Sequence, residues 1–409
     1  MRHRSFVKLG APVLIGALVL SASACGSRDE DKGTGGTGNK TVVKIGVIAP
    51  LSGDLSALGL GIKNSADLAA KKANEKNEVP GVEFQVAAED DEAKPPVGQQ
   101  VATKLVADKA VLGVVGTLNS SVAQTVQPVL FSAKLLQVSP ANTNPSLTQG
   151  DQWAAGTKKR LYDTYFRTST TDAIQGPFGA DFVTNELKFT KIFTVHDKKT
   201  YGQGLAGTFT DRFKQNGGQV VGAGTVNPDD KDFSPVITQV QKSGAQAVYY
   251  GGEYPAAAPL SEQMKSKGVK IPLIGGDGIF SADYIKIAGA AAEGDHATSV
   301  GAPTEQLASA KTFVDDYTKA GYKDPYEAYG AYSYDATWAI IQAVKGVVKD
   351  GKVPDDARAQ VTTAEGSVSF DGVTGKVAFD EFGDTTNKVL TMYKVQGGKW
   401  TPVKTEEFK

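Results

Sequence analysis

The sequence has 409 residues, of which 40% are hydrophobic and 22% are charged, a composition typical of a globular protein. Its 44 Lys and Arg residues nearly balance its 45 Asp and Glu residues, so no basic field indicates a nucleic-acid partner. One cysteine and three histidines exclude an intrachain disulfide framework and a cysteine-based zinc site, and we expect neither a metal ion nor another cofactor. The length predicts two globular domains.

The first 24 residues predict a signal peptide, 1–24, for export from the cytoplasm. A basic start is followed by an apolar stretch at 9–20 and by small residues at 21–24, which lead directly to Cys25. The apolar stretch is too short to span a bilayer, and this order of segments is that of a cleaved signal. The following residues, 26–40, contain no apolar residue and predict a flexible tether.

The small residues before Cys25 resemble the lipobox of bacterial lipoproteins, although Ala22 stands where that pattern prefers Leu. The resemblance implies that Cys25 is lipidated, becomes the new N-terminus, and, with the tether 25–40, anchors the protein to the outer face of the cell membrane. A plain secretion signal followed by an incidental cysteine is the alternative.

Strand and helix patterns alternate along the remaining chain. Short β-branched or alternating runs that end in Gly, Pro or polar residues predict strands, and longer segments with apolar residues at helical spacing predict helices. The predicted strands are 42–49, 82–88, 111–115, 136–139, 191–196, 219–225, 247–251 and 271–275. The predicted helices are 61–77, 96–108, 121–133, 176–187, 204–216, 233–243 and 255–267. Two such runs predict an α/β protein with two doubly wound parallel sheets.

Polar residues follow many of the predicted strands. Ligands of open parallel sheets bind outside the carboxyl ends of the strands, so the site is expected there. Hydroxyl-bearing residues follow strands of the first half, at 116–121 and 139–143, whereas tyrosines and carboxylates follow strands of the second half, at 196–202, 252–255 and 276–278. A zwitterionic ligand requires such a division.

The order and spacing of many segments resemble the branched-chain amino-acid binding proteins of ABC importers, a family of type I periplasmic binding proteins. The segments include GTLNSS, SPANTNPSLT, YFRT, HDKKTYGQGLA, YYGGEYP, GGDG and FDGVTGKVAFDEFGD, and they span residues 45–384. The resemblance implies two doubly wound lobes joined by a three-strand hinge, with crossovers at 165–172, 298–303 and 380–388. Lobe 1 would comprise 41–166 plus 301–380, with 317–349 returning to it as two helices. Lobe 2 would comprise 167–300 plus 381–409.

Motif by motif, the resemblance also implies a site for an amino-acid backbone. Ser120 and Thr143 would bind the ligand carboxylate, and Ala141, Thr143 and Asp277 would bind its ammonium group. Independently of the resemblance, Ser120 and Ser121 open a predicted helix, whose first amides favour an anion. A helix cap, an ordinary loop and a turn are the alternative roles of these residues.

A pocket for the ligand side chain is implied in the same way, lined by Leu58, Leu118, Tyr201, Glu253 and Tyr326. Core or rim packing is the alternative role of these residues. Leu58 stands where the family often has Trp, which predicts a roomier pocket, and Glu253 stands where it often has Tyr. If Glu253 faces the ligand, a leucine-like side chain leaves the carboxylate unpaired, which favours a polar, amide-bearing or cationic ligand. Alternatively, Glu253 faces solvent while Tyr254 turns inward.

The implied function is capture of a branched-chain or related amino acid between the lobes and its delivery to the permease subunits of an ABC importer, by an extracytoplasmic monomer. The alternative is a sensor of amides, urea or polar amino acids that does not transport. We do not expect an enzyme. His196 and Asp197 are adjacent and cannot form a Ser-His-Asp arrangement, no Gly-x-Ser-x-Gly motif is present, and the glycines at 59 and 61 lack the third glycine of a dinucleotide-binding loop.

Overall fold

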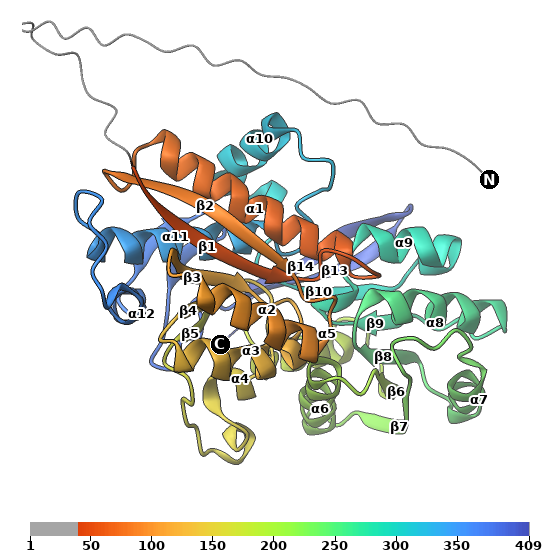
Figure 1. Ribbon diagram of the computed structural model, residues 1–409. Coiled ribbons are helices and arrows are strands. Elements are labelled where there is room, and N and C mark those ends of the chain that lie inside the picture. Colours follow the sequence, from red (N-terminus) through yellow and green to blue (C-terminus); the bar gives the residue numbers. More distant parts are fainter. Residues whose placement is uncertain (1–39, 409) are drawn as a thin grey trace, which may run out of the picture. The chain divides into compact units, whose positions relative to one another are not determined.

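The computed structural model describes residues 40–408 (Figure 1). The predicted signal peptide 1–24, the predicted lipidation site Cys25 and the tether up to residue 39 lie outside the described residues. Within the described part of the chain, no helix is both long enough and apolar enough to cross a membrane.

Five parallel strands form the first sheet, in the order β2-β1-β3-β4-β5. They are β1 Thr41–Ala49, β2 Val82–Asp90, β3 Val111–Gly116, β4 Leu136–Ser139 and β5 Tyr165–Arg167. Alternate residues of β1 enter different cores, because successive side chains of a strand point to opposite faces. Val47 packs in one core with helices α1 Ser56–Glu75 and α11 Gly330–Val347, and Ile48 packs in another with α2 Pro95–Ala107 and α3 Ser120–Ser132.

Seven strands form the second sheet, in the order β14-β13-β10-β9-β8-β6-β7. The parallel strands are β6 Lys191–His196, β7 Gln219–Thr225, β8 Ala247–Gly251, β9 Leu273–Gly275 and β10 His296–Val300. The remaining pair, β13 Val389–Gln396 and β14 Lys399–Glu407, is antiparallel and extends the sheet beyond β10. The helices between these strands are α5 Asp172–Asn185, α6 Thr200–Gln215, α7 Ser234–Ser243, α8 Tyr254–Ser266 and α9 Ala282–Ala288.

The α/β fold class and the strand–helix alternation predicted from the sequence are confirmed, and three helices begin at least four residues earlier than predicted, among them α6, which starts at Thr200 rather than at residue 204. Helix α1 starts at Ser56 rather than at residue 61, and α5 starts at Asp172 rather than at residue 176. Close packing requires a glycine near the start of α1 and near the start of α5. A Cβ at Gly59 would lie 1.8 Å from the Pro50 carbonyl oxygen, and one at Gly176 would lie 2.1 Å from the Thr208 hydroxyl.

The chain passes between elements of the two sheets three times, after β5, after β10 and between β12 and β13. After β10 it forms α10 Lys311–Ala320, α11, α12 Ala357–Glu365 and the hairpin of β11 Ser369–Gly372 and β12 Gly375–Ala378. Helices α11 and α12 pack against β3 and β4 of the first sheet (Figure 1). Over 317–349, where the sequence predicted two helices, the structure has the end of α10 and the whole of α11, and α12 follows beyond that range. The predicted lobe boundaries themselves stay predictions.

Candidate functional site

The strand order reverses between β1 and β3 in the first sheet and between β6 and β8 in the second. Loops that leave neighbouring strands in opposite directions open a crevice at such a point, which is where ligands of these sheets bind. Residues from the ends of both sheets line one small cavity: Leu58, Leu118, Asn119, Ser120, Ala141, Tyr201, Glu253, Asp277, Gly278 and Tyr329.

Seven of the residues predicted from the sequence meet in this cavity. They come from α1, the ends of β3 and β4, the start of α6, and the ends of β8 and β9, and they are Leu58, Leu118, Ser120, Ala141, Tyr201, Glu253 and Asp277. The cavity has a volume of about 20 Å³, which is roughly the space of one water molecule. An amino acid therefore enters only if the loops of the two sheets move apart.

Ser120 begins helix α3 at the cavity. The preceding residue, Asn119, does not cap the helix with its side chain. The first amides in the helical ladder are those of Val122 and Ala123, which both donate to the Asn119 carbonyl oxygen. The amides of Ser120 and Ser121 precede that ladder, at the positive end of the helix dipole, where an anion is stabilised.

Asp277 is buried at the opposite wall, where two tyrosine hydroxyls converge on its carboxylate. Tyr201 donates to Oδ1 at 2.7 Å and Tyr329 donates to Oδ2 at 2.9 Å. Burial raises the pKa of Asp277, and the two tyrosine hydrogen bonds oppose that rise. A cation at this wall would replace the lost solvation of the carboxylate.

A second buried carboxyl, Asp172, lies close to Asp277 and was not predicted from the sequence. It is the first residue of α5, its amide donates to the Thr143 carbonyl oxygen at 2.8 Å, and its Oδ1 accepts from Gln175 Nε2 at 2.9 Å. Burial, aided by the neighbouring Asp277, raises the pKa of Asp172 to about 8. An acidic residue at the start of a helix ordinarily interacts with the helix dipole at the surface, so nothing in the sequence indicates that Asp172 is a buried carboxyl beside Asp277.

Thr143 does not line the cavity, although Ala141 in the same loop does. The Thr143 hydroxyl is buried and meets no partner in good hydrogen-bond geometry among the described residues, although it lies close enough to the Asp172 carboxyl to oppose the rise of its pKa. A buried hydroxyl without a partner is unfavourable, so this group is available to a ligand once the loops separate. Its role in binding stays a prediction.

Tyr326 lies outside the cavity, which corrects the lining predicted from the sequence. Its hydroxyl donates to Glu305, and its ring packs 5.3 Å from that of Phe313. The tyrosine that reaches the cavity is Tyr329, which immediately precedes helix α11. The two tyrosines are three residues apart, and no pattern in the sequence distinguishes the one that turns toward the ligand.

Glu253 faces the cavity, and its carboxylate already has partners. Oε1 accepts from Asn119 Nδ2 at 2.6 Å, and Oε2 accepts from Lys199 Nζ at 2.9 Å. The expectation that an apolar ligand would leave this carboxylate unpaired is therefore corrected. Tyr254 does not turn into the cavity, since its hydroxyl donates to the Asp54 carbonyl oxygen.

A larger cavity of about 370 Å³ adjoins Glu253 on its other side. Asp54, Lys94, Asp197 and Lys199 contribute to its lining. Burial and the Glu253 carboxylate raise the pKa of Asp197 to about 8. Glu253 thus lines both cavities.

The site offers a helix N-terminus on one side, a buried carboxylate on the other and apolar walls between them. Among residues 40–408, no three His, Cys, Asp or Glu side chains are grouped so that they could hold a metal ion. A site of this kind between the strand ends of two doubly wound sheets defines a solute-binding protein.

Comparison with known proteins agrees with this class. The sequence matches the periplasmic binding protein family over residues 42–399. It is 32% identical over 356 residues to the Leu/Ile/Val-binding protein homolog 1 of Brucella melitensis. The match covers 87% of this chain and 91% of that protein.

Two solved structures are similar at 26% identity. They are the branched-chain amino acid transporter substrate binding protein LivJ from Streptococcus pneumoniae in complex with isoleucine (TM-score 0.78, 89% of this chain and 99% of that chain) and the leucine binding protein LivK from Thermotoga maritima (TM-score 0.77, 89% and 98%). The chain belongs to the periplasmic binding protein family, whose members bind solutes outside the cytoplasm, and the family predicted from the sequence is confirmed.

Proposed function

We propose that this protein is the substrate-binding component of an ABC importer and captures a branched-chain or closely related amino acid between its two sheets. Its similarity to a Leu/Ile/Val-binding protein homolog, to a leucine binding protein and to a branched-chain amino acid binding protein in complex with isoleucine supports this class of ligand. The observation that carries the proposal is the pairing of Ser120, at the N-terminus of α3, with Asp277 in one cavity. The partial positive charge of the helix N-terminus suits the carboxylate of a free amino acid, and the carboxylate of Asp277 suits its ammonium group.

In this proposal the ligand carboxylate binds the Ser120 hydroxyl and the first amides of α3, and the loop of Ala141 and Thr143 completes the backbone site. Asp277 receives the ammonium group. Leu58 and Leu118 form the apolar wall for the side chain. Because the cavity is small, the ligand binds a more open arrangement of the loops and then bridges the two sheets, which shifts the equilibrium toward closure.

A thermal-shift panel tests the proposed ligand class. Each of the twenty amino acids, urea and short amides is added to the protein, and a ligand that binds the native state raises the unfolding midpoint by mass action. Leucine, isoleucine and valine are expected to give the largest shifts. A shift with urea or amides alone would contradict the proposal and favour a sensor of such compounds.

We also propose that the protein is anchored to the outer face of the cell membrane through a lipid on Cys25. The support is the sequence pattern of a basic start, a short apolar stretch and small residues before the cysteine. The Cys25→Ser variant is expected to leave the membrane fraction and appear in the soluble one. A variant that stays with the membrane would contradict lipid anchoring.

A further inference from the structure

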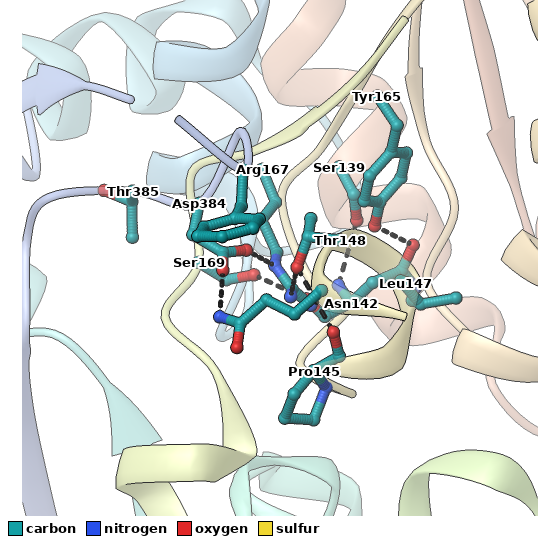
Figure 2. Close-up of polar contacts among 12 residues, drawn as sticks. Ser139, Asn142, Pro145, Leu147, Thr148, Tyr165, Arg167, Ser169, Asp384 and Thr385 are labelled. Carbon is teal, nitrogen blue, oxygen red and sulfur yellow. Dashed lines mark hydrogen bonds and ion pairs between the residues drawn. The ribbon is translucent and has the colours of Figure 1, made fainter. Parts of the chain in front are cut away.

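Arg167, the last residue of β5, is completely buried and contacts the loop that carries Ala141 and Thr143 (Figure 2). Its Nη1 donates to the main-chain carbonyl oxygens of Asn142 at 3.0 Å and Asn144 at 2.8 Å. Those two residues flank Thr143 on either side. The guanidinium group therefore fixes the main chain on both sides of a predicted ligand-binding residue.

Arg167 has two further side-chain partners, Thr148 and Asp384, and Asp384 comes from a distant part of the chain. Nη2 donates to the Thr148 hydroxyl at 2.5 Å, and Nε donates to Oδ1 of Asp384 at 2.6 Å. Asp384 lies in the third crossing, between β12 and β13, and its Oδ2 accepts from Gln149 Nε2 at 2.7 Å. The Arg167 amide also donates to the Gly383 carbonyl oxygen at 3.0 Å.

Asn142 ties the same loop to the neighbouring loop, which follows β3. Its Nδ2 donates to the Leu118 carbonyl oxygen at 2.8 Å, and its Oδ1 accepts from the Tyr165 hydroxyl at 3.0 Å. Leu118 lines the cavity. A shift of residues 142–144 would therefore displace both the loop after β4 and the loop after β3.

A buried ion pair is a poor device for stability alone, because the desolvation of both charges offsets most of their attraction. Among the described residues, the only other side chain that donates to these two carbonyl oxygens is Ser169, which reaches the Asn142 oxygen at 3.2 Å. The geometry suits orientation, since a planar guanidinium fixes several acceptors at once.

We propose that Arg167 and Asp384 are positioning residues, which hold residues 141–144 in their ligand-binding conformation and link that conformation to the third crossing between the lobes. The proposal rests on the proposed function, because the loop is taken to bind the amino-acid backbone.

The test uses two kinds of variant of the purified protein. Asp384→Asn removes the charge that orients Arg167 and keeps the size of the side chain. The double variant Arg167→Met with Asp384→Leu removes both charges together, an exchange that often leaves stability unchanged. Asp295→Asn is the matched control, because Asp295 is equally buried and pairs with Lys265 at 2.6 Å, away from the cavity.

Two readouts are compared, the Kd for leucine by calorimetry and amide hydrogen exchange of residues 139–149 in the ligand-free protein, referred to the amides of β1. Both the single and the double variant are expected to bind leucine at least about tenfold more weakly, equivalent to about 1.4 kcal/mol, and to exchange faster in this loop. The control Asp295→Asn is expected to change neither the Kd for leucine nor the exchange of this loop, whatever its thermal unfolding midpoint.

Wild-type affinity and unchanged loop exchange in the stably folded double variant would overturn the inference, as would an equal loss of affinity in Asp295→Asn. If the wild-type protein binds none of leucine, isoleucine and valine, the proposed function fails, and the exchange measurement still decides whether Arg167 and Asp384 position the loop.

Discussion

The side-chain amide of Asn119 donates to Glu253 Oε1 at 2.6 Å, and this hydrogen bond joins the loop after β3 to the loop after β8. A second contact between the same ends of the two sheets is that of Thr200 with Gln124, at 2.9 Å. A hydrogen bond between neutral groups, such as that of Thr200 with Gln124, contributes only about 0.5–1.5 kcal/mol, and one to a charged group, such as that of Asn119 with Glu253, about 1.5–3 kcal/mol. The contacts across the cavity are therefore strong enough to favour closure and weak enough to separate when a ligand enters.

Glu253 is satisfied within the protein, so its partner Lys199 is expected to determine which ligand side chains are tolerated. The Lys199→Met variant leaves the carboxylate paired only with Asn119, and an apolar ligand then faces a poorly compensated charge. We expect the ratio of the Kd for leucine to that for glutamine to rise by about tenfold, or about 1.4 kcal/mol. Calorimetry with both amino acids measures this ratio, and an unchanged ratio would mean that Glu253 does not face the ligand side chain.

Removal of the Ser120 hydroxyl is expected to weaken binding without a comparable loss of stability. Ser120→Ala leaves one carboxylate oxygen of the ligand without its donor, at a cost of about 1–3 kcal/mol in binding free energy. Ser132→Ala, at the other end of α3 and exposed, is the matched control. Equal affinities of the two variants would contradict a carboxylate site at the start of this helix.

Amino-acid binding is expected to lower the pKa of Asp277 and so to release protons over the pH range in which this carboxyl titrates in the ligand-free protein. Burial raises the pKa of Asp277 in the ligand-free protein, and an ammonium group beside the carboxylate favours its charged form and lowers that pKa again. Calorimetric titrations in buffers of different ionisation enthalpy count the protons released. Asp277→Asn should abolish both tight binding and this release, whereas Asp295→Asn, a buried carboxyl away from the cavity, should leave the release unchanged.

The free energy of unfolding of the ligand-free protein is expected to fall between pH 6.5 and pH 8. The pKa of Asp172 is raised to about 8 in the folded state, so its contribution is present at low pH and is lost as the pH rises through that value. His296 acts with the opposite sign, since burial lowers its pKa to about 4, but its contribution is complete near its usual pKa of about 6.5.

One buried carboxyl changes stability by up to about 1.4 kcal/mol per pH unit in this range. Denaturant unfolding at several pH values measures the slope, which Asp172→Asn should reduce. The exposed Asp211→Asn is the control. A slope that is the same in both variants would show that Asp172 ionises normally in the folded protein.

Most of the strands and most of the cavity lining could be predicted from the sequence, because strand ends in parallel sheets are marked by β-branched runs followed by Gly, Pro or hydroxyl residues. Ser120, Ala141 and Asp277 all follow such runs. The strands β13 and β14 were not predicted, although Gly397-Gly398 between them is a sequence pattern typical of a two-residue hairpin turn. Their positive φ angles of 59° and 74° suit such a turn.

The remaining features depend on contacts between distant segments. The partners of Glu253 are Lys199 and Asn119, which are 54 and 134 residues away in the sequence. The burial of Asp172 and the choice of Tyr329 over Tyr326 follow from how helices seat on the sheets, and local patterns of residues do not encode that arrangement.

The central claim is that the cavity recognises both charges of a free amino acid. Calorimetric titration with leucine, with 4-methylpentanoate, which lacks the ammonium group, and with 3-methylbutylamine, which lacks the carboxylate, tests it directly. Leucine is expected to bind, and each analogue to bind at least about a hundredfold more weakly, because a charge-assisted partner is left unpaired. An analogue that binds as tightly as leucine would contradict the assignment of Ser120 or Asp277 to that charge.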